Sequence, residues 1–185
     1  MITRGDLFIV IVSVFLACLV GVTLYFLLRI RRASRATWSD LVGRLIEVDR
    51  NRIAVVALDL VDETGQPRED GASEIEPESF WDLVGGMNGL EILEKNCEVL
   101  IDLAAYVQRW HPEAVVVAER LRLNAREIQW HIARLKGAAQ TGNLISSFPL
   151  YAQRAVATYY LMTRHLLELY ERANIAEFRQ LEEVL

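Results

Sequence analysis

The stretch from Leu7 to Leu28, LFIVIVSVFLACLVGVTLYFLL, contains no charged side chain and is almost wholly apolar. A helix rises about 1.5 Å per residue, so a helix of this length covers the hydrocarbon core of a bilayer. A core helix of a small globular domain needs a polar face, which this stretch lacks. We therefore expect a transmembrane helix at residues 7–28 after a short tail at residues 1–6. A cleaved signal peptide is the alternative, although such peptides have a shorter apolar core.

Basic residues follow this stretch directly and predict its orientation. On the N-terminal side of the stretch, the positive charge of Arg4 is balanced by the negative charge of Asp6. Lys and Arg beside a span stay preferentially in the cytoplasm. We expect a single-pass signal-anchor protein whose C-terminal domain is cytoplasmic, with a basic collar at residues 29–37 that contacts anionic lipid headgroups. The collar arginines are Arg29, Arg31, Arg32 and Arg35.

The charge of the chain indicates which kind of partner to expect, and its cysteine content indicates the compartment. The 185-residue chain has a net charge of −5 although the collar is basic, so the remaining domain is strongly acidic. An acidic domain argues against nucleic acid as a partner. Two cysteines, Cys18 and Cys97, are too few for a disulfide framework and suit a reducing compartment.

Beyond the collar, apolar residues recur at three- and four-residue steps, which predicts amphipathic helices. We expect a helix over residues 38–60 that bends or breaks near 49–51, and further helices over 90–110, 112–137, 146–169 and 175–185. The predicted fold is all-α: one N-terminal transmembrane helix followed by a soluble antiparallel bundle of about four to five helices at residues 38–185.

Residues 62–82, DETGQPREDGASEIEPESFWD, interrupt the helical pattern. The segment has eight acidic residues and one basic residue, with two glycines and two prolines. Its composition cannot bury a core, so we expect an acidic loop. It is either a solvated connection, a docking segment for a basic partner, or a strip that folds back on the arginine collar.

The sequence contains no motif with recognisable catalytic chemistry. No phosphate-binding loop, dinucleotide fingerprint, nucleophile elbow or CxxC is present. Glu127 and His131 lie one helical turn apart, where a surface hydrogen bond is the simplest interpretation; His165 is expected to pack or to pair with a nearby glutamate. Cys97 falls on an apolar stripe and is expected to be a buried, inert thiol. We therefore predict no catalytic residue, no metal and no cofactor.

Two sets of residues are candidates for binding. The first is a basic and aromatic surface, which suits an acidic peptide or phosphate, although interleaved glutamates also suit a plain solvated face. The second is a ladder of small residues in the apolar stretch, which allows close helix packing in lipid. The surface comprises Arg120, Arg122, Arg126, Trp130 and Arg134, and the ladder comprises Ser13, Ala17 and Gly21.

These features predict a non-enzymatic interaction module held at the membrane, an adaptor or accessory subunit. Its expected partners are membrane lipid and either another protein or a second copy of the chain. A helical bundle that binds a small ligand is the alternative, and an enzyme is the least favoured class. A large apolar cavity between the helices would favour the ligand, whereas a closed core with a distinct surface patch would favour the module.

Overall fold

The computed structural model describes residues 11–21, 23–24, 37–62 and 75–185. The chain divides into two compact units, Met1–Ala36 and Thr37–Leu185. Within the described ranges the regular elements are helices and no strand is present, which confirms the all-α prediction and the helical bundle.

In the first unit, residues 11–21 and 23–24 are helical. Large apolar side chains around this helix are exposed, among them Ile11, Phe15 and Leu19. Within the part of the chain that the structure describes, no helix is both long and apolar enough to cross a membrane. The rest of the predicted span, residues 7–10, 22 and 25–28, lies outside the described residues, as do the collar arginines.

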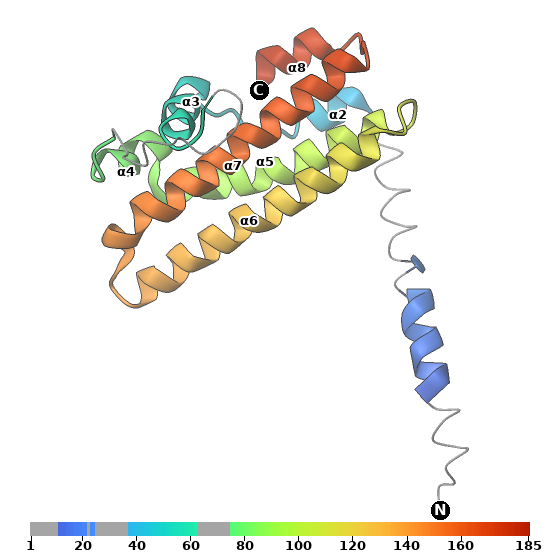
Figure 1. Cartoon of the computed structure of the whole chain (residues 1–185), viewed down its shortest axis with the longest axis horizontal. Coiled ribbons are helices and arrows are strands. Elements are labelled where there is room, and N and C mark those ends of the chain that lie inside the picture. Colours follow the sequence, from blue (N-terminus) through green and yellow to red (C-terminus); the bar gives the residue numbers. More distant parts are fainter. Residues whose placement is uncertain (1–10, 22, 25–36, 63–74) are drawn as a thin grey trace, which may run out of the picture. The chain divides into compact units, whose positions relative to one another are not determined.

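Three long helices form the centre of the second unit: α5 (Gly86–Val107), α6 (Ala114–Gln140) and α7 (Leu144–Arg172). They lie side by side and run in alternate directions, because short connections join consecutive helices (Figure 1). Their facing stripes form a closed core that agrees with the predicted periodicity. The fully buried side chains include Leu90, Leu93 and Leu100 of α5, Leu121, Ile128 and Ile132 of α6, and Tyr159, Met162 and Leu166 of α7.

Four short helices complete the described part of this unit: α2 (Trp38–Val42), α3 (Arg50–Leu58), α4 (Ser79–Val84) and α8 (Phe178–Val184). About four to five helices were expected. In the described part of this unit there are three long helices, with four short helices packed around them. Helix α4 corrects the predicted loop at 62–82, since Phe80 and Val84 are buried and hold this end of the segment on the bundle. Residues 63–74 of that loop lie outside the described residues.

The predicted helix over residues 38–60 is broken into α2 and α3, and the break covers residues 43–49, so it begins earlier than the expected weak point near 49–51. The buried side chain of Asn96 on α5 pairs with the backbone of this segment. Its Oδ1 accepts from the Ile46 N–H at 2.9 Å, and its Nδ2 donates to the Ile46 carbonyl at 2.7 Å. Asp49 then caps α3 by accepting from the Arg52 N–H at 3.1 Å. Asn96 therefore supplies the Ile46 backbone with the two partners that a helix would otherwise supply, and Asp49 marks the start of α3.

A tight connection joins α4 to α5 and depends on glycine. Gly85 and Gly86 have φ angles of 77° and 61°, in the left-handed region that other residues rarely adopt. One turn later, a Cβ on Gly89 would lie 1.8 Å from the Val84 carbonyl oxygen. The close approach of the two helices therefore requires glycine at this position.

Replacing Asn96 with leucine should lower the free energy of unfolding of the full chain by about 2 kcal/mol, because the Ile46 N–H and carbonyl would lose their partners. Urea unfolding followed by far-ultraviolet circular dichroism measures this change. Asn51 on α3 is exposed and provides the matched control, since Asn51→Leu should change stability by less than about 0.5 kcal/mol. Equal effects of the two substitutions would contradict the role assigned to Asn96.

Candidate interaction surface

Helix α6 has one face in the core and the opposite face in solvent. Its 27 residues pack mainly against α5 and α7. The buried face carries Ala118, Leu121, Ile128 and Leu135, at helical spacing. This face fixes how the helix is turned about its axis, and so fixes which side chains face outward.

The five predicted partner residues all lie on α6, but they do not form one uniform basic patch. Arg126, Trp130 and Arg134 are exposed, and the Arg134 guanidinium lies 4.9 Å from the centre of the Trp130 ring. Arg120 faces α7, where its Nη1 lies 3.1 Å from Nε2 of His165. Arg122 is more covered and forms an ion pair with Glu119 on the same helix.

The outward face also carries an apolar stripe that the sequence analysis did not single out. Val116, Leu123 and Trp130 recur every seven residues and are 67%, 63% and 48% exposed. Seven residues are close to two turns, so these side chains lie nearly in line along α6. The seven-residue spacing is visible in the sequence, but the core residues Leu121, Ile128 and Leu135 of the same helix repeat with the same spacing. We name Val116, Leu123 and Trp130 the α6 stripe.

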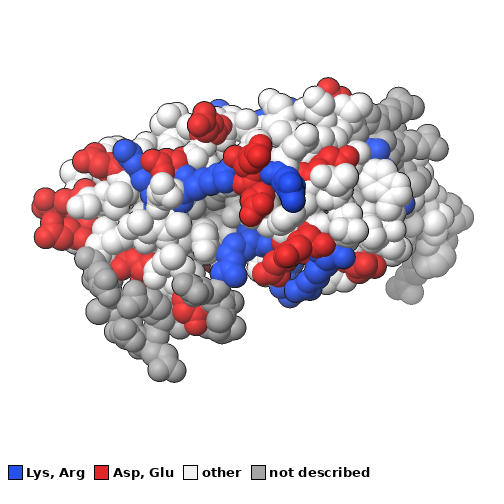
Figure 2. All heavy atoms as spheres, turned by 90° about the horizontal axis from the view of Figure 1, so that it is seen from above, with Lys and Arg blue, Asp and Glu red and all other residues white. Residues whose placement is uncertain are grey.

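Charged residues of both signs flank the α6 stripe. Glu119, Arg126, Glu127 and Arg134 share its side of the helix at steps of three and four residues. Elsewhere on the molecule the charges are also mixed: Figure 2 shows acidic and basic side chains intermingled on the face that it displays. The visible described surface there offers no broad area of one sign to attract a polyelectrolyte.

His131 lies beneath this surface rather than on it, although the predicted partner, Glu127, is its nearest carboxylate. The residue is only 3% exposed, and neither ring nitrogen has a hydrogen-bond partner in the described structure. The nearest carboxylate oxygen, Oε1 of Glu127, is 3.7 Å from Nε2. Burial lowers the pKa of His131 below its ordinary value and outweighs Glu127, and the nearby Arg154 lowers it further. The imidazole packs against the rings of Trp130 and Tyr151, at 5.0 and 5.8 Å between centroids.

The remaining candidates from the sequence are His165, Cys97 and the ladder of small residues. His165 was expected to pack or to pair with a glutamate; its Nε2 lies 3.1 Å from Arg120 Nη1, and burial and then Arg120 lower its pKa, while Glu168 acts in the opposite direction. Cys97 is buried as expected, and burial raises the pKa of its thiol to about 12, which suits an inert thiol.

Ser13, Ala17 and Gly21 are exposed along the helix at residues 11–21, where their four-residue spacing places them on one side.

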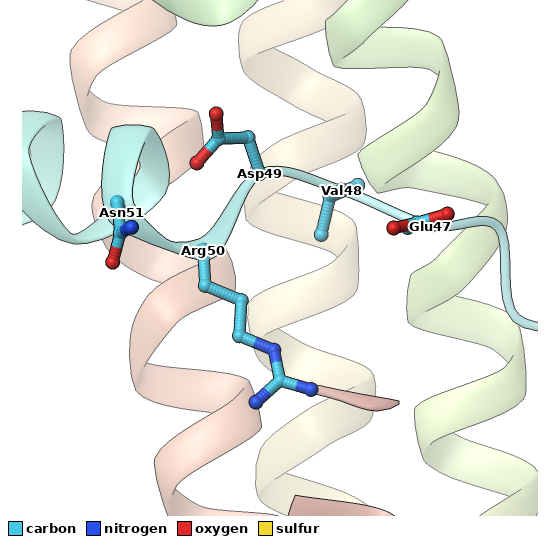
Figure 3. A pocket seen from close by; sticks show the side chains of 5 residues that line it. All are labelled: Glu47, Val48, Asp49, Arg50 and Asn51. Atoms are coloured by element: carbon cyan, nitrogen blue, oxygen red, sulfur yellow. The ribbon is translucent and has the colours of Figure 1, made fainter. Parts of the chain in front are cut away.

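An open depression of about 550 Å³ lies where the chain leads into α3. Its lining residues are Glu47, Val48, Asp49, Arg50 and Asn51 (Figure 3). Asp49 and Arg50 point away from one another in that view, and Arg50 donates to the Glu182 carbonyl. The charged groups therefore do not converge on a common ligand position.

A smaller cleft of about 270 Å³ lies at the end of the bundle where α5 stops and α7 turns into α8. Tyr106, Trp110 and His111 line one side, and Asn174 and Glu177 line the other. Asn174 has a φ of 48°, which turns the chain after α7. This cleft could not be predicted from the sequence, because its two walls lie more than sixty residues apart in the chain.

Neither a metal centre among the described residues nor a similar known protein indicates a function for this chain. Among the described residues, no group of three or more His, Cys, Asp and Glu side chains could hold a metal ion. No protein-family model matches the chain, and comparisons with curated proteins and with solved structures also give no match. The functional interpretation therefore rests on the geometry of the chain itself.

The buried histidines predict that stability falls in acid. Because folding lowers the pKa of His131, the unfolded chain takes up a proton at about pH 6.5 while the folded chain does not, so stability is lost as the pH falls through this range. His131→Leu should therefore reduce the difference in unfolding free energy between about pH 7.5 and about pH 5.5. Chemical denaturation of the full chain at the two pH values measures this difference.

His111→Gln is the control, since this ring is about one-third exposed. It should leave the pH dependence close to that of the unmodified chain. His165 has a lowered pKa as well, so some pH dependence should remain in the His131→Leu variant. A variant with the same pH dependence as the unmodified chain would contradict the assignment of a buried, neutral His131.

Proposed function

We propose that this chain is a single-pass, membrane-anchored interaction module that works without catalysis, as an adaptor or accessory subunit. The observation that carries the proposal is the exposed α6 stripe, which lies opposite a closed core. The outer face of a surface helix is ordinarily polar. Three large apolar side chains in line on such a face suit a contact with another helix.

The surroundings of the stripe support a specific contact rather than general stickiness. Trp130 is held from two sides, by Arg134 at 4.9 Å and by the Tyr151 ring at 5.9 Å between centroids. A tryptophan fixed before binding loses little side-chain entropy on association. Tryptophan and arginine are also the side chains that most often dominate interface energies.

The proposed anchor rests on the first unit and on the sequence beside it. Large apolar side chains are exposed around the helix at residues 11–21, and the uncharged stretch continues on both sides of it. Lipid is a favourable environment for such a helix. With the arginine collar on its C-terminal side, we propose that residues 29–185 are cytoplasmic and that the collar contacts anionic headgroups.

A ligand-binding bundle is the second candidate, and the cleft beside Tyr106 and Trp110 favours it. Its volume of about 270 Å³ lies near the lower end of the sizes that small-molecule sites occupy. The Arg109 guanidinium lies 4.7 Å from the centre of the Tyr106 ring and so occupies a face on which a cationic ligand could stack. We therefore prefer the α6 stripe as the site of function.

Photo-crosslinking in native membranes tests the proposal whatever the identity of the partner. A photoreactive residue placed at Leu123 of the full chain should give one discrete crosslinked product, because this position is at the centre of the α6 stripe. The same residue at Lys95, which is exposed on α5, should give none. Absence of a product at Leu123, or equal products at both positions, would contradict the proposed interaction surface.

A further inference from the structure

We infer that the α6 stripe binds a second copy of this chain, with the two α6 helices antiparallel and a two-fold axis passing between Arg126 and Glu127. The inference rests on the proposed function and names the partner of that surface. The face complements itself in this arrangement, in its apolar residues and in its charges. A two-fold contact of this kind uses the same patch on both copies.

The apolar residues of the two copies are complementary in this arrangement. With the axis between Arg126 and Glu127, Leu123 of each copy faces Trp130 of the other. Val116 faces Gly137, which is exposed and has open space where a Cβ would lie. Trp130 therefore packs against an apolar side chain of the other copy, and Val116 lies against a residue without a side chain. The two-fold axis makes each contact occur twice.

The charges match in the same arrangement. Arg126 of each copy faces Glu127 of the other, so two opposite-charge pairs flank the axis. Glu119 faces Arg134 of the second copy, and this pair also occurs twice. All four residues are exposed on the outward side of α6. Complementary charges across an interface specify orientation and register more than they add affinity.

Other pairings of the same face bring like charges together. A parallel pair in register places Arg126 against Arg126 and Glu127 against Glu127. An antiparallel pair centred on Leu123 places Glu119 against Glu127 and Arg120 against Arg126. Because like charges at close range are unfavourable, the pattern on α6 favours the axis between Arg126 and Glu127 over these two arrangements.

The contact is modest, because the α6 stripe has only three large apolar residues. An anchor compensates for this, since two copies tethered to one membrane meet at a high effective concentration. A two-fold axis can stand along the membrane normal, so both copies can be anchored from the same side. Self-association of the full chain in membranes is the expected result.

A charge-swap experiment tests both the partner and the register. Two differently tagged full chains are expressed together, and one tag is used to recover the other after solubilisation. Arg126→Glu in both copies, or Glu127→Arg in both copies, should lower recovery about tenfold, because each creates two like-charge pairs. Arg126→Glu in one copy with Glu127→Arg in the other should restore it, since both pairs again have opposite signs.

Lys95→Glu and Glu98→Arg on α5 are the matched controls and should leave recovery unchanged, because both positions are exposed away from α6. Circular dichroism should give the same helix content for every variant. The inference is overturned if the single reversals do not reduce recovery, or if the mixed pair recovers no better than either of them. A crosslinked product at Leu123 that contains a different protein would overturn self-pairing while leaving the proposed function intact.

Discussion

The burial of α6 between α5 and α7 is the constraint on which the rest of the molecule depends. Leu121, Ile128 and Leu135 lie on one side of α6 because they recur every seven residues, and the burial of this side against α5 and α7 fixes the rotation of the helix. The same rotation turns Val116, Leu123 and Trp130 into solvent. The closed core and the exposed stripe are therefore two consequences of one packing arrangement, and the proposed function follows from the second.

Buried polar groups set details that the apolar pattern leaves open. Asn96 pairs with the backbone of Ile46 and so holds an extended segment against α5. On the α3 side of α7, the Gln153 Nε2 donates to Asp59 Oδ2 at 2.6 Å. Since an unpaired polar group in a core is costly, each pair favours one arrangement of the short helices over others. His131 differs, because its ring is buried without a hydrogen-bond partner among the described residues.

The sequence was sufficient for the long helices and insufficient for what joins them. The stripes of α5, α6 and α7 were predicted correctly, because each repeats over many turns. A bend or break was expected near residues 49–51, but the earlier start of the break was not, because Asn96 acts from a distant part of the chain. His131 was placed on the surface because spacing alone shows its distance from Glu127 but not its rotation toward α7. The basic residues of α6 were predicted as one surface, whereas in the structure Arg120 faces α7 and Arg122 pairs with Glu119. The apolar residues between them could be recognised as exposed only once the rotation of the helix was known.

Electron paramagnetic resonance distances between spin labels on two full chains in lipid test the central claim most directly. Labels at Gln129 and Gln140, in a Cys18→Ser background, sample positions near and far from the proposed axis. With a rise of about 1.5 Å per residue, antiparallel pairing offsets the two Gln129 labels by only about 8 Å along the helices and the two Gln140 labels by about 40 Å. The account predicts a short distance at Gln129 and a long one at Gln140. Equally short distances at both, or no coupling between chains at Gln129, would contradict it.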